Sequence, residues 1–373
     1  MITPIAIFFN IGEINRNSLP SMATATGLRY LKKMDDKHPI LPSSKVGILL
    51  INLGTPDGTG YWDIRRYLSE FLSDRRVIEM NPLFWQPILQ GVILSIRPNR
   101  SGQAYKRVWN FDEDESPLRT ITREQTQRLS DSMGNGSLII DWGMRYGSPS
   151  IAQKLTEFRE KGCDRILLAA LYPQYSATTT ATAYDKAFQA LQKMRWQPAI
   201  RTLPPYHDNP AYIDALKTSV EKHLSNLEWE PDVILTSFHG LPVKYFRAGD
   251  PYHCHAAKTS RLLCERLDLG TDKIKLTFQS RFGPAAWLEP YTDDVLAQLA
   301  EGGKKNVVVI TPGFSADCLE TLDEIENESR EHFMEAGGEN FSVVPCLNAS
   351  DESILMLEKI IKKELGGWCD KRG

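Results

Sequence analysis

The sequence lacks the features that several large classes of protein require. Across 373 residues the formal net charge is only −3, from 44 Lys and Arg against 47 Asp and Glu, and no run of basic residues stands out. A polyanion needs a concentrated positive surface, so nucleic acid is not expected as a partner. No apolar stretch is long enough to span a bilayer. The composition, 42% hydrophobic and 24% charged, instead favours a globular protein of about two domains.

Cysteine is present but has no pattern. The cysteines share no repeated spacing, so they indicate neither a disulfide framework nor a zinc-binding module. They are Cys163, Cys254, Cys264, Cys318, Cys346 and Cys369. Scattered cysteines are typical of a reducing compartment, and the sequence therefore predicts a cytoplasmic protein.

Residues 1–44 differ from the rest of the chain. They are mostly polar, contain several prolines and show few periodic apolar positions, which predicts a disordered N-terminal extension. The pattern leaves the true start codon open among Met1, Met22 and Met34.

From residue 46 onward the sequence alternates between short apolar strands and amphipathic helices. Two stretches without charge, 46–53 and 233–237, are typical of strands buried in a parallel sheet. Strands that alternate with helices indicate crossover units, so we expect an α/β protein with two doubly wound domains and a cleft between them. The other predicted strands are 138–142, 165–171, 199–202, 275–278, 306–311 and 341–345. The predicted helices are 62–72, 122–133, 150–161, 177–194, 210–227, 253–267, 292–301, 319–336 and 350–364.

The segment 81–96 is apolar around nearly its whole circumference when drawn as a helix. One interpretation is a helix buried in the core. The other is a lid whose apolar face meets a large hydrophobic ligand or a membrane surface. Its apolar residues are Leu83, Phe84, Trp85, Ile88, Leu89, Val92 and Ile93, and the segment is flanked by Arg75, Arg76, Arg97 and Arg100.

His239 follows the predicted strand 233–237 and precedes Gly240 and Pro242, which mark its end. In open α/β sheets, ligands bind outside the carboxyl ends of the strands, where crossover helices leave the sheet uncovered. His239 is therefore a candidate catalytic or binding residue. The alternative is an ordinary loop histidine held by hydrogen bonds.

The predicted helix 319–336 carries Glu320, Glu324 and Glu328 at intervals of four residues. Like charges on one face of a helix repel one another and cost stability. A row of carboxylates that faces an imidazole across a cleft suits a divalent metal that is held loosely. The alternative is a solvated acidic face, which surface helices often carry.

Several long motifs, spread over residues 46–364, resemble the ferrochelatase family. They are Tyr172-Pro173-Gln174-Tyr175-Ser176, Ser237-Phe238-His239-Gly240-Leu241-Pro242, Gly249-Asp250-Pro251-Tyr252, Gln279-Ser280-Arg281-Phe282-Gly283-Pro284-Ala285-Ala286-Trp287-Leu288 and Phe314-Ser315-Ala316-Asp317-Cys318-Leu319-Glu320-Thr321-Leu322. The resemblance implies an enzyme that inserts ferrous iron into protoporphyrin IX with release of two protons, the last step of haem synthesis.

The resemblance also implies a fold and a set of site residues. The fold would be chelatase-like, with two similar domains that each contain a mainly parallel four-stranded sheet flanked by helices. The domains would be 45–224 with 345–373, and 225–344. Carried over residue by residue, the catalytic residues are His239 and Glu320, and the metal ligands are His239, Glu320 and Glu324. The substrate-binding positions are Leu53, Arg145, Tyr146, Tyr172, Ser176, Trp287 and Phe314.

Departures from the family pattern bear on cofactors. Relatives with a [2Fe-2S] cluster use a cysteine where this chain has Ala177, and three more in a C-terminal tail, where this chain offers only Cys369. A cluster normally needs four thiolates, so none is predicted, and no other tightly bound cofactor is expected. Fe2+ and protoporphyrin IX are expected as substrates.

Other functions remain open at this point. A porphyrin or haem carrier would need the pocket but neither the base nor the acidic helix. The alternatives with the same fold are a chelatase that metallates coproporphyrin and one that inserts cobalt into a corrin precursor. Whether His239 binds iron or accepts the pyrrole protons also stays open.

Porphyrins are largely apolar and partition into bilayers. We therefore predict that residues 81–96 form a mobile lid over the porphyrin pocket, in peripheral and reversible contact with a membrane surface. The oligomeric state is left open between monomer and homodimer.

Overall fold

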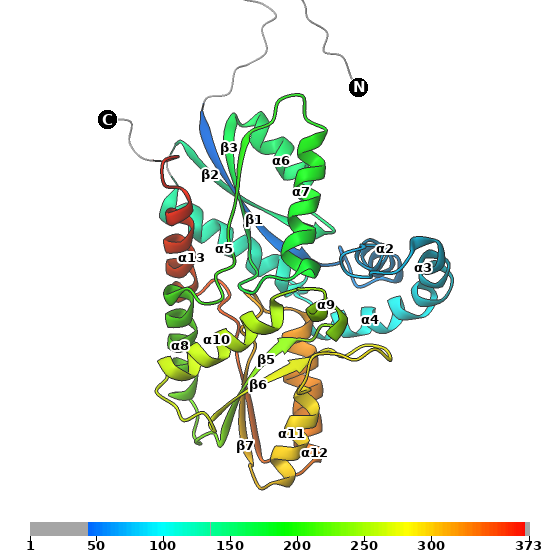
Figure 1. Ribbon diagram of the computed structural model, residues 1–373, viewed down its shortest axis with the longest axis vertical. Coiled ribbons are helices and arrows are strands. Elements are labelled where there is room, and N and C mark those ends of the chain that lie inside the picture. Colours follow the sequence, from blue (N-terminus) through cyan, green and yellow to red (C-terminus); the bar gives the residue numbers. More distant parts are fainter. Residues whose placement is uncertain (1–43, 135, 370–373) are drawn as a thin grey trace, which may run out of the picture. The chain divides into compact units, whose positions relative to one another are not determined.

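The computed structural model describes residues 44–134 and 136–369, so the predicted N-terminal extension lies outside the described residues except for Ser44. Two parallel four-stranded sheets organise these residues (Figure 1). The first sheet has the strand order β2-β1-β3-β4 and the second has the order β6-β5-β7-β8. The predicted α/β architecture is confirmed.

The bounds of the elements follow the sequence pattern closely. The strands are β1 Lys45–Gly54, β2 Leu138–Tyr146, β3 Cys163–Ala170, β4 Ala199–Thr202, β5 Val233–His239, β6 Ile274–Gln279, β7 Asn306–Ile310 and β8 Asn340–Val344. The α-helices are α2 Tyr61–Leu72, α3 Pro82–Ile88, α4 Leu94–Val108, α5 Pro117–Met133, α6 Ile151–Glu160, α7 Thr182–Gln192, α8 Pro210–Leu224, α9 Val243–Arg247, α10 Tyr252–Arg266, α11 Thr292–Glu301, α12 Arg330–Glu335 and α13 Asp351–Glu364. The π-helical segments η1 Leu89–Ile93, η2 Ala177–Ala181 and η3 Glu320–Ser329 run directly into α4, α7 and α12.

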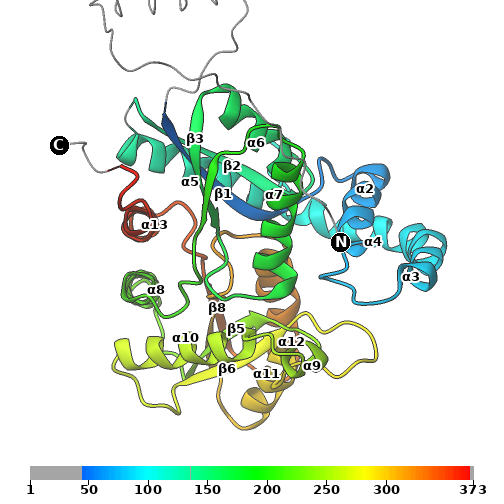
Figure 2. The same cartoon turned by 45° about the horizontal axis from the view of Figure 1, so that its top comes forward.

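Alternate residues of the central strands pack on opposite faces of each sheet. In β1, Leu49 packs with α6 and α7, whereas Ile48 and Leu50 pack with α5, α8 and α13. In β5, Leu235 packs with α11 and α12, whereas Ile234 belongs to the same cluster as Ile48 and Leu50. One apolar core, to which α8, α10 and α13 contribute, therefore runs from one sheet to the other (Figure 2).

A helical lobe of α2, α3, η1 and α4 projects beside the first sheet (Figure 1). The sequence pattern predicts a helix that ends near Ile96, but α4 continues through Pro98 to Val108. Proline cannot donate to the carbonyl one turn earlier, which belongs to Leu94. The hydroxyl of Tyr61 on α2 donates to that carbonyl instead, at 3.0 Å. The carbonyl of Leu94 thus receives its hydrogen bond from another helix. The local sequence around Pro98 cannot predict this contact.

The exposed apolar face of the segment 81–96 differs from the predicted one. Trp85 points into the lobe, where its indole N–H donates to the carbonyl of Leu72 at 2.7 Å. Leu89 is fully buried, and Ile93 packs against the same cluster. The side chains that do face outward are Leu83, Phe84, Ile88, Val92 and Ile96. We call these five residues the apolar tip.

The C-terminal helix α13 packs against α5, which covers the first sheet, and against α8, which contacts β8 of the second sheet. Arg201 on β4 holds the chain beyond α13, because its guanidinium donates to the carbonyls of Glu364 at 2.6 Å and of Gly366 at 2.9 Å. The domain boundaries, 45–224 with 345–373 and 225–344, stay a prediction, since the two sheets share one core. Within the described part of the chain, no helix is both long and apolar enough to cross a membrane.

Candidate active site

His239 is the last residue of β5 rather than the residue after the strand. It pairs in register with Gln279, the last residue of β6. Nδ1 of His239 lies 2.7 Å from the carbonyl oxygen of Gly240, which fixes the orientation of the ring. The half-buried imidazole therefore stands at the carboxyl edge of the second sheet, where ligands of α/β proteins bind.

The end of β6 connects this histidine to the acidic helix. Gln279 donates from Nε2 to the backbone carbonyl of Glu320 at 3.0 Å. The next residue, Ser280, donates from Oγ to Oε2 of Glu324 at 2.6 Å. The last residue of β6 and the residue after it thus hold the start of η3 beside the end of β5.

The carboxyl of Glu324 interacts electrostatically with both His239 and Glu320. Burial raises the pKa of Glu324, the hydrogen bond from Ser280 and the imidazole lower it, and the charge of Glu320 raises it. The net shift of this pKa is upward. A buried carboxyl with a raised pKa, near an imidazole and a second carboxyl, is suited to take up and release protons.

The helix that carries these glutamates is π-helical over its first ten residues, whereas the sequence pattern predicts an α-helix. A π-helix has a wider turn, and such segments occur frequently at functional sites. Further along η3, Asp323 receives two hydrogen bonds from the guanidinium of Arg107 on α4, and Glu328 lies 3.7 Å from the same group. The acidic row therefore divides into a part near the imidazole and a part that binds the helical lobe.

Within residues 44–134 and 136–369, no group of three or more His, Cys, Asp or Glu side chains is arranged to hold a metal ion. His239, Glu320 and Glu324 therefore do not form a ready-made site with three ligands. Their role as metal ligands stays a prediction.

Trp287 packs beside the turn that follows His239. A Cβ atom at Gly240 would lie 3.2 Å from Cε3 of Trp287 and 2.8 Å from the carbonyl oxygen of Gln279, so the indole can approach only because this residue is glycine. Pro242 and Trp287 form an isolated antiparallel bridge. The buried indole N–H has no hydrogen-bond partner among the described residues, which leaves a donor available.

Other predicted pocket residues come from the strand ends of the first sheet. Leu53 and Tyr146 pack in one cluster with Leu319, the residue before Glu320. Phe314 packs in a neighbouring cluster against residues that include Met144 of β2. The structure therefore brings these apolar side chains near the start of η3.

Three side chains of the helical lobe have pKa values that Glu320 shifts, and the sequence does not identify them as site residues. Burial raises the pKa of Tyr67 and of Tyr105, and Glu320 raises both further. Burial lowers the pKa of Arg97, and Glu320 opposes that shift. The guanidinium of Arg97 also lies 4.9 Å from the ring centroid of Phe282. Tyrosines on the buried face of a helix look like core residues in a sequence, so no local signal identifies them.

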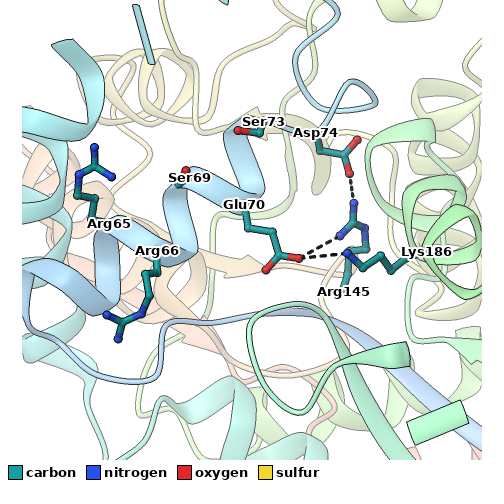
Figure 3. Close-up of a pocket in the computed structure, with 8 residues that line it drawn as sticks. All are labelled: Arg65, Arg66, Ser69, Glu70, Ser73, Asp74, Arg145 and Lys186. Atoms are coloured by element: carbon teal, nitrogen blue, oxygen red, sulfur yellow. Dashed lines mark hydrogen bonds and ion pairs between the residues drawn. The ribbon is translucent and has the colours of Figure 1, made fainter. Parts of the chain in front are cut away.

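Arg145 makes its contacts elsewhere, in a cavity of about 570 Å³ between α2 and α7 (Figure 3). It pairs with Asp74 and, at 3.6 Å, with Glu70, which also lies 3.7 Å from Lys186. A second cavity, of about 930 Å³, shares Asp74 and Arg145 and extends along the loop before α3. The described lining of both cavities comes from the first sheet and its helices rather than from β5 or η3.

Tyr172 and Ser176 lie on the turn after β3. The hydroxyl of Tyr172 is buried and has no hydrogen-bond partner among the described residues, and its pKa is raised by burial and then by the nearby Tyr146. Ser176 is buried at the start of η2, and its hydroxyl donates to Asp250 at 2.9 Å. The first side chain is thus available to a ligand, whereas the second is already engaged by the protein.

Comparison of the sequence with known proteins identifies the family of this chain. A family model described as Ferrochelatase matches residues 45–365. The ferrochelatase of Agrobacterium fabrum is 54% identical over 339 residues, which cover 91% of this chain and 98% of the relative. The ferrochelatase of Brucella ovis is 57% identical over 332 residues, which cover 89% of this chain and 94% of the relative. The chain belongs to the ferrochelatase family.

Solved structures agree on the fold of this ferrochelatase-family protein. SirB from Bacillus subtilis with Fe3+ matches with a TM-score of 0.53 at 11% identity, covering 86% of this chain and 95% of that chain. The sirohydrochlorin chelatase SirB in complex with cobalt matches with a TM-score of 0.51 at 10% identity, covering 86% and 97%. At this low sequence identity, the similarity shows a chelatase-like fold but does not identify the substrate. The predicted fold and the predicted function, a metal–porphyrin chelatase of haem synthesis, are confirmed.

Proposed function

We propose that this enzyme inserts Fe2+ into protoporphyrin IX to give protohaem, with His239, Glu320 and Glu324 at the reacting centre. The observation that carries the proposal is the pair of hydrogen bonds by which Gln279 and Ser280 hold Glu320 and Glu324 beside the end of β5, where His239 lies. Metallation removes the pyrrole N–H protons of the macrocycle and admits a divalent cation. The site must therefore offer both a base and a ligand for the cation.

The orientation of His239 supports an assignment of roles. Because Nδ1 lies 2.7 Å from the carbonyl oxygen of Gly240, Nδ1 carries the proton and Nε2 presents a lone pair. We assign uptake of a pyrrole proton to Nε2, and we assign the next proton acceptor to Glu324, whose pKa is raised by burial. Glu320, the other carboxyl at the start of η3, would contact the incoming iron.

The apolar side chains near the start of η3 would form the walls for the macrocycle. Leu53 and Phe314 supply partly buried apolar side chains from the first sheet and the loop before η3, with the fully buried Tyr146 packed beside Leu53, and Trp287 does so from the second sheet. The unpartnered donors of Trp287 and Tyr172 suit the carboxylates at the edge of a porphyrin. Coproporphyrin carries more of these carboxylates, so it is the competing acceptor.

We also propose that the enzyme works in the cytoplasm in peripheral contact with a membrane. Leu83 and Phe84 of the apolar tip are 81% and 71% exposed, far more than a core helix leaves in water. An apolar product that partitions into bilayers is handled most easily at their surface. The scattered cysteines favour a reducing compartment. Three further statements remain predictions. The protein is a monomer or a homodimer, it has no tightly bound cofactor, and it carries no [2Fe-2S] cluster.

A matched pair of histidine variants tests the proposed chemistry. His239→Ala should reduce anaerobic Fe2+ insertion at least about 100-fold, while binding of protoporphyrin, followed by fluorescence, is kept. His332→Ala removes an exposed histidine of α12 and should leave the rate unchanged. Protoporphyrin IX and coproporphyrin are assayed side by side, and a higher kcat/KM for coproporphyrin would overturn the substrate assignment. Near-wild-type turnover of His239→Ala would overturn the role of the imidazole.

A further inference from the structure

Two stacked histidines lie away from His239, where loops of the two sheets meet. The ring centroids of His207 and His255 are 3.6 Å apart, and the ring planes are within 7° of parallel. His207 belongs to the loop between β4 and α8, and His255 belongs to the first turn of α10. Two imidazolium ions at this distance would repel each other strongly, so the stack favours neutral rings.

His255 also accepts a hydrogen bond from the turn after β3. The backbone N–H of Tyr175 donates to Nδ1 of His255 at 3.2 Å. A nitrogen that accepts a hydrogen bond carries no proton, so this contact requires the neutral ring with its proton on Nε2. Protonation of Nδ1 would turn the acceptor into a donor and place it against the N–H of Tyr175.

The same region of α10 holds the rest of this turn. Asp250, just before α10, accepts from the hydroxyl of Ser176 at 2.9 Å and from the backbone N–H of Ala177 at 2.8 Å. Gln174 donates to the hydroxyl of Thr259 at 3.1 Å. Four successive residues of the turn are therefore anchored to α10 and to Asp250 just before it, and the contact from Tyr175 is the one whose acceptor is an imidazole.

The charged groups that face the two histidines have opposite effects on their protonation. Asp208 and Asp250 favour protonation, whereas Lys258, which donates to Asp208 at 2.6 Å, disfavours it. Burial lowers the pKa of both histidines, that of His207 to about 4. Because His207 resists protonation so strongly, the first proton goes to His255.

We propose that His255, stacked on His207, is a positioning residue that holds the turn of residues 172–177 in place only while both rings are neutral. The inference rests on the proposed substrate-binding role of Tyr172, and it makes that role dependent on pH. Because burial lowers the pKa of His255, its ring becomes protonated only below the ordinary range of histidine, and this protonation breaks the contact with Tyr175. The turn then loses one of its anchors, and the enzyme binds porphyrin more weakly.

The side chains allow a set of matched variants. His255→Asn places Oδ1 where Nδ1 of histidine lies, so it keeps an acceptor for Tyr175 but does not titrate. His207→Phe keeps a stacked ring and removes its charge. His255→Leu removes the acceptor at every pH. The control is His223→Asn, because His223 is also half-buried with a pKa lowered by burial but contacts Ser342 of β8 instead.

Hydrogen exchange at the backbone amide of Tyr175 tests the contact without reference to catalysis. In wild type and in His223→Asn, we expect protection of this amide to fall as the pH drops from 7.5 to 5, by up to about tenfold for each unit below the pKa of His255. In His255→Asn the protection should stay flat, and in His255→Leu it should be low throughout. The same pH dependence in wild type and His255→Asn would overturn the proposal.

The KM for porphyrin over the same pH range tests the positioning role. It should rise toward low pH more steeply in wild type and in His207→Phe, which keeps the titrating His255, than in His255→Asn, whereas pH effects from other groups are common to these variants and cancel. If amide exchange follows the prediction but KM does not, the turn does not position substrate and the positioning role is overturned. Failure of wild type to insert iron at pH 7.5 would instead overturn the proposed function, and it would leave the exchange result intact.

Discussion

Ser280 donates a 2.6 Å hydrogen bond to Oε2 of Glu324 from a backbone position with a φ of 65°. Residues other than glycine rarely adopt this left-handed conformation, which costs free energy unless the surroundings hold it. Here the conformation aims Oγ at a carboxyl beside His239. Burial raises the pKa of that carboxyl, and the bond from Ser280 opposes the rise.

Ser280→Gly should raise the pKa of Glu324 further, because it removes the hydrogen bond that stabilises the ionised form. Glycine accepts the positive φ, so the backbone should not be strained. The limb of the kcat/KM profile that depends on ionised Glu324 should therefore move to higher pH. Asp268→Gly is the control, since Asp268 has a φ of 55° in an exposed loop. Equal shifts in both variants, or none in either, would contradict the assignment.

Asp74 anchors the loop that leads into the segment 81–96, because it accepts hydrogen bonds from Arg145, Tyr146 and Thr182. Asp74→Asn should lower the free energy of unfolding by about 3 kcal/mol, since it leaves a buried guanidinium without its partner. Asp185→Asn, which breaks an exposed ion pair with Arg76, should cost at most about 1 kcal/mol. Urea unfolding measures the free energy of unfolding of both variants. An equal decrease in the two would show that the buried ion pair stabilises the protein no more than the exposed one.

The contribution of Asp74 should depend on pH in a defined way. Burial alone would raise its pKa, but hydrogen bonds from Thr182 and the backbone of Arg76 and the charge of Arg145 make the net shift downward. A carboxyl with a lowered pKa contributes stability above its unfolded pKa, about 3.9, and loses that contribution as the pH falls through the folded value. The difference between wild type and Asp74→Asn should therefore stay constant from about pH 7 to 5 and shrink below about pH 4. A difference that shrinks above pH 5 would point to a histidine instead.

Much of the fold can be predicted from the sequence because the buried strands are nearly free of charge. β1 and β5 are recognisable for this reason, and the position of His239 follows from the end of β5. The π-helical geometry of η3 cannot be predicted, since four-residue spacing of glutamates fits an α-helix equally well. The continuation of α4 through Pro98 is hidden too, because the hydroxyl that compensates comes from Tyr61 on another helix.

The candidate site is only partly visible in the sequence. His239 and Glu324 lie far apart along the chain, and what joins them is the pair Gln279 and Ser280, whose side chains carry no charge and so stand out in no pattern. Arg145 lines a cavity beside α2 and α7, where Arg145 and Tyr146 both donate to Asp74. Nothing in the sequence links Asp74 to these two residues, so this arrangement cannot be predicted.

The apolar tip predicts how the enzyme binds membranes. Replacing Leu83, Phe84 and Ile88 by serine should weaken binding to anionic vesicles and raise the KM for porphyrin, with little loss of stability because these side chains are exposed. Leu89→Ala, in the same segment, should instead cost about 2–5 kcal/mol, because Leu89 is fully buried. Vesicle sedimentation and thermal unfolding measure the two effects. A triple variant that unfolds while vesicle binding is absent in wild type would mean that the segment is ordinary core.

The account centres on the glutamates of η3 near His239, and the rate of anaerobic Fe2+ insertion into protoporphyrin IX by Glu320→Gln tests it most directly. The matched variant is Glu326→Gln, on the same helix, whose carboxyl lies 3.9 Å from the guanidinium of Arg330. We predict that Glu320→Gln inserts iron at least about 100-fold more slowly than wild type while binding porphyrin normally, and that Glu326→Gln matches wild type. Insertion by Glu320→Gln at the wild-type rate, across pH and iron concentration, would contradict the account.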